Sequence, residues 1–186
     1  GISGNAGFQT SGEKFKFLVR GSGASNADYT TGDDEGVVNS RFNEYDLKTG
    51  FAYQASKVKT ELRYNYNTLE LGLPEELGAQ TNDREPLGHS QKIDNHIISS
   101  KTTFFFEKSN LEAVFGYTSN NREEFEDHEH EEEETEEEHN EEEDEGPALD
   151  MVLQTFNYNL RYNLPRLGKL QSIVGVQGMR QTNANF

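Results

Sequence analysis

The feature that most constrains the fold is a strict alternation of apolar and polar residues with a period of two. It is clearest in a hairpin over residues 95–121, whose arms cover 98–106 and 111–119 around a polar turn at 107–110. One face of each arm is apolar, comprising Ile98, Thr102, Phe104 and Phe106 in the first and Leu111, Ala113, Phe115 and Tyr117 in the second. Because successive side chains of a strand point to opposite faces, this pattern predicts a sheet with one apolar and one polar face.

The same unit recurs along the whole chain and predicts eight strands in four antiparallel hairpins. The expected strands cover residues 1–10, 14–23, 40–53, 57–71, 98–106, 111–119, 149–163 and 170–183. Short turns fall near 11–13, 54–56, 107–110 and 165–168, whereas long polar loops fall near 24–39, 72–94 and 122–148. Turns and loops therefore segregate by length to opposite ends of the predicted sheet.

Strand length favours a membrane barrel over a soluble sheet. Several expected strands exceed the usual length of about five or six residues, and a strand that crosses a bilayer needs about 9–11 residues. Such barrels also combine an apolar outer face with a polar interior, short turns on one side and long loops on the other. The chain therefore predicts an all-β, antiparallel, up-and-down transmembrane β-barrel segment. The alternative is a soluble acidic metal-binding β protein.

Four stretches resemble the barrel of TonB-dependent outer-membrane receptors of the Bacteroidetes type. They are Ser-Arg-Phe-Asn-Glu-Tyr-Asp-Leu-Lys-Thr-Gly at 40–50, Glu-Leu-Arg-Tyr-Asn-Tyr at 61–66, Leu-Gly-Leu-Pro-Glu-Glu at 71–76 and Asn-Tyr-Asn-Leu-Arg-Tyr-Asn at 157–163. The resemblance implies a barrel of about 22 strands closed by a plug domain. It also implies import of a metal ion or a metal chelate of the siderophore kind, energised through TonB.

Residues 1–186 would then be a partial barrel in the outer membrane, surrounded by lipid, with its long loops extracellular. The sequence contains neither a plug nor a TonB-contacting box, so contact with TonB would involve a plug region outside this chain. A small complete eight-stranded barrel with a structural or adhesive role is the competing interpretation. The poor apolar alternation before Phe186 argues against it.

The charge of the chain is concentrated in one segment. The formal net charge is −17, but half of the 34 acidic residues lie within 123–145 and the remainder is close to neutral. No basic patch suits nucleic acid, so nucleic acid is not an expected partner. The chain has no cysteine, which excludes disulfides and thiolate chemistry.

The acidic segment also contains the only residues in the sequence whose types and spacing suggest a specific chemistry, which is metal binding. Imidazole and carboxylate groups together suit divalent zinc, nickel or copper. The candidate metal ligands are His128, His130, His139, Glu126, Asp127 and Glu129. They would gather metal at the extracellular face of a transporter whose substrate is zinc, nickel, copper or chelated iron. The alternative is an acidic loop exposed to solvent, in which repulsion between the like-charged carboxylates opposes a fixed metal site.

No catalytic motif is present, so we do not expect an enzyme. No pairing of a nucleophile with a base can be recognised in the sequence. Arg41, Arg63 and Arg161 lie at polar strand positions. We expect them to pair with Glu44, Glu61 or Asp46 inside the barrel rather than with an anionic chelate. His89 and His96 are expected at the surface.

Overall fold

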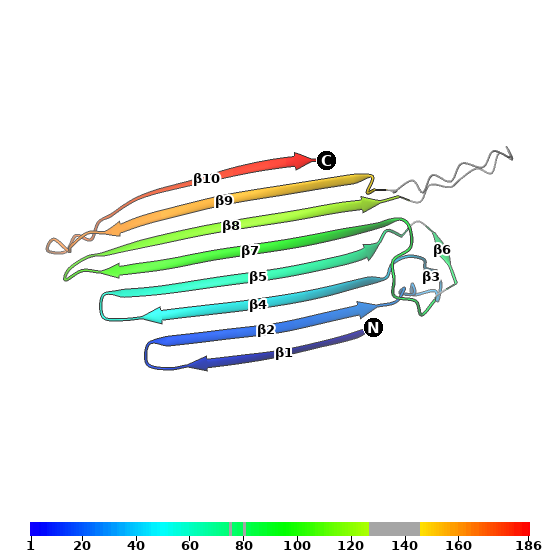
Figure 1. Cartoon of the computed structure of the whole chain (residues 1–186), viewed down its shortest axis with the longest axis horizontal. Coiled ribbons are helices and arrows are strands. Elements are labelled where there is room, and N and C mark those ends of the chain that lie inside the picture. Colours follow the sequence, from blue (N-terminus) through cyan, green and yellow to red (C-terminus); the bar gives the residue numbers. More distant parts are fainter. Residues whose placement is uncertain (75, 80, 127–145) are drawn as a thin grey trace.

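The computed structural model describes residues 1–186 except 75, 80 and 127–145. An eight-stranded antiparallel sheet dominates it, in the order β1-β2-β4-β5-β7-β8-β9-β10. Each strand therefore lies beside its neighbour in the chain, apart from the two short strands β3 and β6 (Figure 1). The prediction of an all-β antiparallel up-and-down sheet is confirmed. The sheet is open, however, because β1 and β10 each pair with one strand only.

The strands of the main sheet are long. They are β1 (Ile2–Ser11), β2 (Phe15–Asn26), β4 (Phe42–Gln54), β5 (Val58–Gly72), β7 (Ser90–Phe105), β8 (Asn110–Phe125), β9 (Leu149–Asn163) and β10 (Ile173–Asn185). A separate two-stranded sheet pairs β3 (Gly36–Val37) with β6 (Leu77–Gly78). No helix among the described residues is long and apolar enough to cross a membrane.

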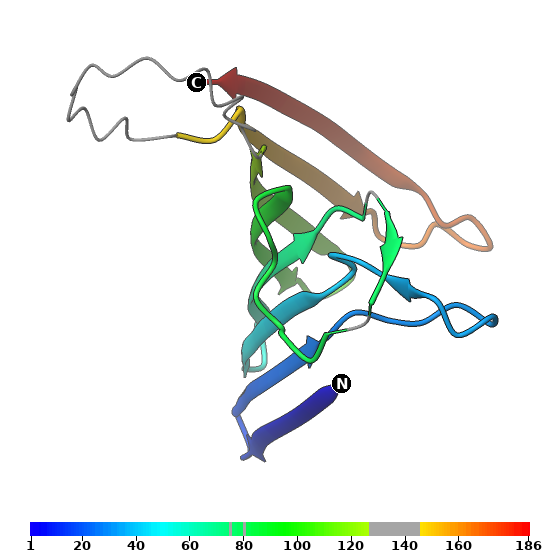
Figure 2. The same ribbon diagram turned by 90° about the vertical axis from the view of Figure 1, so that its right-hand side faces the viewer.

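The connections segregate by length as expected. Figure 1 shows the short turns β1–β2, β4–β5 and β7–β8, together with the longer β9–β10 connection, at one end of the sheet, which we call the turn end. The long connections lie at the opposite end, which we call the loop end. Figure 2 shows that the sheet is curved and that β3 and β6 lie to one side of it.

The structure differs from the sequence-based boundaries in three places. The central hairpin is longer, because β7 begins at Ser90 and β8 continues to Phe125, into the expected loop over 122–148. The expected four-residue turn at 165–168 is wrong, since the connection covers 164–172 and contains a bridge between Leu167 and Leu170. The short strands β3 and β6 were not expected within the polar loops 24–39 and 72–94.

The register confirms the two predicted faces. Leu62 of β5 aligns with Phe51 on one side and with Ser100 on the other, and Ser100 aligns with Phe115. Five such rows, from Val58 to Tyr66 along β5, form what we call the apolar band. At about 3.4 Å per residue they cover about 27 Å of strand. At the strand tilt of about 35–45° in outer-membrane barrels this corresponds to a height of about 21 Å, against an apolar height of roughly 25 Å in such barrels.

The apolar band has no protein packed over it within the described residues. Val37 and Ala113 are the only buried hydrophobic residues in the described part of the chain, and no large side chain in that part is fully buried. In contrast, Leu62 is 47% exposed, Ile98 49% and Phe115 42%. The sheet therefore presents a continuous hydrophobic surface. A soluble protein normally exposes apolar residues singly, and does not expose a contiguous apolar area of this extent.

The two rows of the apolar band nearest the loop end contain the tyrosines Tyr64 and Tyr66 of β5. The Tyr66 hydroxyl donates to Asp94 Oδ1 at 2.8 Å, and the Tyr64 hydroxyl lies 2.9 Å from His96 Nδ1. The His96 ring also stacks beside Tyr64, with the ring centroids 6.2 Å apart. Such rings combine an apolar body with a polar tip, which suits a boundary between apolar and aqueous surroundings.

Candidate functional site

The polar face of the sheet carries an ionic cluster near the turn end. Two carboxylates are each shared by two cations. Lys59 and Arg63 lie two residues on either side of Glu61 along β5 and share its face. Glu112 has its two bases on the neighbouring strands β7 and β9. Glu61 contacts Lys59 at 2.8 Å and Arg63 at 3.3 Å. Glu112 contacts Arg161 at 3.0 Å and Lys101 at 3.6 Å. All of these groups remain partly exposed, so the pairs contribute little stability, but they keep this face charged and hydrated.

A chain of amide hydrogen bonds crosses the same face closer to the loop end. Asn120 Nδ2 donates to Asn95 Oδ1 at 2.7 Å, and Asn95 Nδ2 donates to Asn67 Oδ1 at 3.3 Å. Asn67 Nδ2 in turn donates to Asp46 Oδ1 at 3.2 Å, and Asp46 Oδ2 accepts from Ser22 Oγ at 3.3 Å. Cross-strand register aligns all five residues, so this amide ladder links β2, β4, β5, β7 and β8.

Removing the centre of the ladder should weaken the sheet. Asn95→Ala deletes two hydrogen bonds and leaves Asn67 Oδ1 and Asn120 Nδ2 without these partners. We expect a loss of about 1–2 kcal/mol in the free energy of unfolding, measured by urea titration in detergent. Asn65→Ala, on the same face of β5 but outside the ladder, is the matched control. An equal loss in both variants would contradict a specific role for the ladder.

The two loops that follow β2 and β5 fold together at the loop end. We call residues 27–41 and 73–89 the loop module, described apart from 75 and 80. Asp28 and Arg41 form its centre: Arg41 Nη2 lies 2.5 Å from Asp28 Oδ2, and Arg41 Nε lies 3.0 Å from Asp28 Oδ1. The Arg41 side chain is only 3% exposed and the Asp28 side chain is 0% exposed. Arg41 also donates to Thr81 Oγ1 at 3.1 Å and to the Glu85 carbonyl at 3.3 Å, so it joins both loops.

Asn39 holds the second loop against the first. Its Nδ2 donates to the His89 carbonyl at 2.6 Å and to the Leu73 carbonyl at 3.3 Å, while its Oδ1 accepts from the Leu87 amide at 2.9 Å. Its backbone φ of 59° lies in the left-handed region, which asparagine tolerates better than most residues. Gly72 lies directly beneath, where a Cβ would overlap Asn39. A small residue is therefore required at this crossing.

Electrostatics stabilise the charged form of the Asp28–Arg41 pair. Hydrogen bonding from the Arg41 guanidinium holds the pKa of Asp28 below its ordinary value, against the opposing effect of burial. The same hydrogen bond raises the pKa of Arg41. Both groups are thus ionised at neutral pH, and neither is offered to a ligand.

The predicted arginine pairings are partly confirmed. Arg63 pairs with Glu61, which was among the expected carboxylates, whereas Arg161 pairs with Glu112. Arg41 pairs with Asp28 in the loop module rather than with Glu44 or Asp46. His96 is exposed as expected, but it lies within β7 on the apolar face rather than at a strand start.

The predicted metal ligands fall mostly outside the described residues. Glu126 is exposed and follows directly on β8 at the loop end. His128, His130, His139, Asp127 and Glu129 lie in the segment that the structure does not describe. Elsewhere, the described residues contain no group of three or more His, Cys, Asp or Glu side chains placed to hold a metal ion. The metal site stays a prediction.

No family model, curated protein or solved structure matches this chain.

Proposed function

We propose that this chain forms part of the wall of an outer-membrane β-barrel. The apolar band would face lipid, and the ionic cluster and amide ladder would face a water-filled interior. The observation that carries this proposal is the exposed apolar band, whose large side chains have no protein cover. Burial of that surface in lipid removes the cost of exposing it to water, and strands of up to 16 residues are long enough to cross with some tilt.

Closure of this barrel needs further strands beside β1 and β10. Each of these strands has an unpaired edge, and unpaired backbone groups are not tolerated inside a bilayer. The open order β1 to β10 therefore favours a partial barrel over a complete eight-stranded one. This agrees with the larger barrel implied by the resemblance to TonB-dependent receptors.

The transport activity that we propose is TonB-energised import of a metal ion or a metal chelate. The loop module and the start of the acidic segment lie at the same end of the sheet. In the proposed orientation this loop end is extracellular, where a substrate arrives first. The acidic segment would concentrate cations there, and contact with TonB would involve a plug region outside this chain.

Uptake by cells that produce the whole protein tests this proposal. Radiolabelled zinc and a ferric chelate should accumulate only with the protein present, and collapse of the inner-membrane proton gradient should abolish the accumulation. Deletion of residues 127–145 should reduce zinc uptake at low external concentration and leave the protein in the outer membrane. Recovery of the folded protein in the soluble fraction, without detergent, would overturn the barrel assignment. If accumulation were unchanged after collapse of the proton gradient, the proposal that TonB energises the import would be wrong.

A further inference from the structure

The polar face has an excess of basic groups beyond those in the ionic cluster. Lys16 and Lys48 project from this face and make no ion pair or hydrogen bond with the described residues. Within the described part of the chain, Arg20 has one polar partner, Asn5 Oδ1 at 2.8 Å, which carries no charge. These three side chains are exposed and lie on the adjacent strands β2 and β4. No ion pair among the described residues neutralises these three groups, although the carboxylate Asp46 lies two residues from Lys48 on the same face of β4.

Two of these bases face each other directly. The register pairs Arg20 of β2 with Lys48 of β4. Like charges directly opposite each other destabilise an antiparallel pair. The next residue of this row, Asn65, is neutral. The pair therefore has a cost in the empty protein that an anion bound between the two groups would remove.

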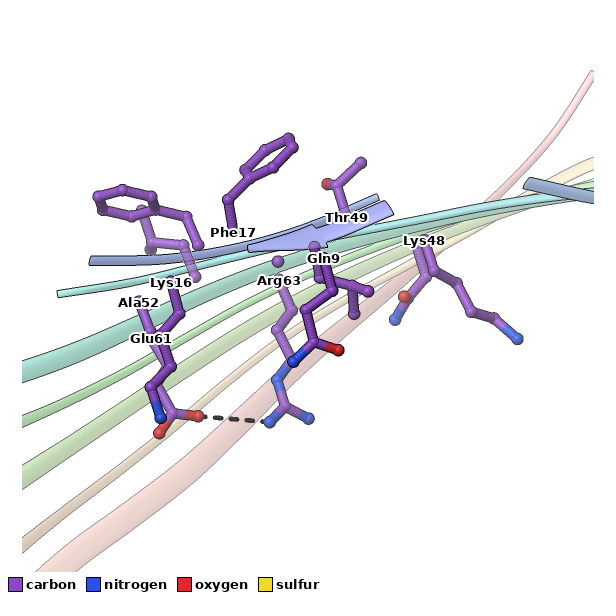
Figure 3. A pocket seen from close by; sticks show the side chains of 13 residues that line it. Gln9, Lys16, Phe17, Lys48, Thr49, Ala52, Glu61 and Arg63 are labelled. Atoms are coloured by element: carbon purple, nitrogen blue, oxygen red, sulfur yellow. Dashed lines mark hydrogen bonds and ion pairs between the residues drawn. The ribbon is translucent and has the colours of Figure 1, made fainter. Parts of the chain in front are cut away.

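A hollow lies beside this pair. Gly50, which has no side chain, lies at the base of this hollow. A Cβ atom built at Gly50 would make only ordinary van der Waals contacts, the nearest with Leu18 Cβ at 3.7 Å. Figure 3 shows Gln9, Lys16, Lys48 and Arg63 directed to one side of the sheet around this point, whereas Phe17 and Thr49 point to the other side. Glu61 also lines the hollow, but Lys59 and Arg63 both contact it and offset its charge.

We propose that this hollow, together with Arg20, binds a small solute that carries two or more carboxylate or phosphate groups. Lysines and an arginine provide charge, and the Gln9 and Asn65 amides provide neutral donors at its edge. The charge also varies along the face, since the acids Glu44 and Asp46 follow on β4 towards the loop end. The inference rests on the proposed function, because it requires the polar face to line an aqueous interior. It names the class of solute recognised at this position as a polyanion, such as an anionic metal chelate.

Titration calorimetry with citrate and with inorganic phosphate, on the whole protein in detergent at low ionic strength, tests this inference. We expect the double variant Arg20→Gln with Lys48→Gln to weaken citrate binding about tenfold or more, because charge pairs at such sites contribute strongly to affinity. Lys57→Gln removes the same kind of charge in the β4–β5 turn and should bind as the unmodified protein does. Citrate should bind more tightly than phosphate if several anionic groups are recognised.

Thermal unfolding gives a second, independent readout. Lys48→Gln should raise the melting temperature without citrate, because it removes the repulsion with Arg20, and should reduce the additional stabilisation by citrate. Equal citrate binding by all variants, or no binding by a folded protein that inserts into liposomes, would overturn this inference and leave the barrel assignment intact. Failure of the folded protein to insert into liposomes would instead overturn the barrel assignment and this inference with it.

Discussion

Ser100→Lys should prevent stable insertion of the sheet into a membrane, whereas Ser99→Lys should be tolerated. The two serines are neighbours in β7 but lie on opposite faces. Ser100 aligns with Leu62 and Phe115 in the middle row of the apolar band, and Ser99 aligns with Arg63 and Gly116 on the polar face. A lysine at mid-depth on the lipid side of a barrel costs about 2–4 kcal/mol. On the interior side the same lysine meets Arg63, at a cost of about 0.2–1 kcal/mol.

The measurement is the free energy of unfolding of the whole protein in lipid vesicles, together with the amount recovered in the outer membrane. The pair is well matched because both positions share one strand, one residue type and intermediate exposure. Equal losses in the two variants would show that the apolar band does not face lipid. A larger loss for Ser99→Lys would reverse the assignment of the two faces.

The sequence predicted the faces of the sheet because the alternation of side chains with a period of two does not depend on where a strand begins or ends. A residue keeps its face as long as the alternation runs without a break, so Leu62, Phe51 and Phe115 could be placed together before their register was known. The antiparallel neighbours followed from the short turns. Closure was not predictable in this way, because it depends on strands that would pair with β1 and β10.

The sequence did not reveal the loop-end extensions of β7 and β8. Alternation of apolar and polar residues disappears there: Asn95 and Asn120 lie on one face, and Asp94 and Asn121 on the other. Backbone pairing continues without the hydrophobic signal, supported instead by amide hydrogen bonds across the strands. Strands whose two faces are both polar look like loops in a sequence, and this explains the shorter arms that were expected.

The loop module also had no sequence signal. Its central contacts join residues far apart in the sequence: Asp28 and Arg41 are 13 positions apart, and Asn39 and His89 are 50 positions apart. Neither pair belongs to a periodic pattern. The local hints are residue types that tolerate a positive φ, Asp34 and Asn39, and the glycine at position 72 beside Asn39. By contrast, the pairing of Arg63 with Glu61 could be predicted, because residues two apart in a strand share a face.

Asp28→Asn should open the loop module while the main sheet stays folded. The change keeps the size of the side chain but leaves Arg41 buried without its counter-charge, and breaking a buried ion pair in this way costs about 3–5 kcal/mol. Hydrogen exchange should accelerate at the Val37 amide, which donates to the Tyr29 carbonyl, and at the Gly72 amide, which donates to the Arg41 carbonyl. Asp33→Asn, at an exposed acid of the same loop, is the matched control and should change neither rate.

Acid should mimic this substitution in the unmodified protein. Because Arg41 holds the pKa of Asp28 below its ordinary value, the stabilisation is fully present above the unfolded pKa of about 3.9. It is lost as the pH falls through the lower pKa of the folded state. Exchange at Val37 should therefore accelerate below about pH 4 relative to strand amides of β5 and β7, after correction for intrinsic exchange. In Asp28→Asn this acid step should be absent. An acid step of equal size in the variant would assign it to another carboxylate and contradict the central role of the Asp28–Arg41 pair.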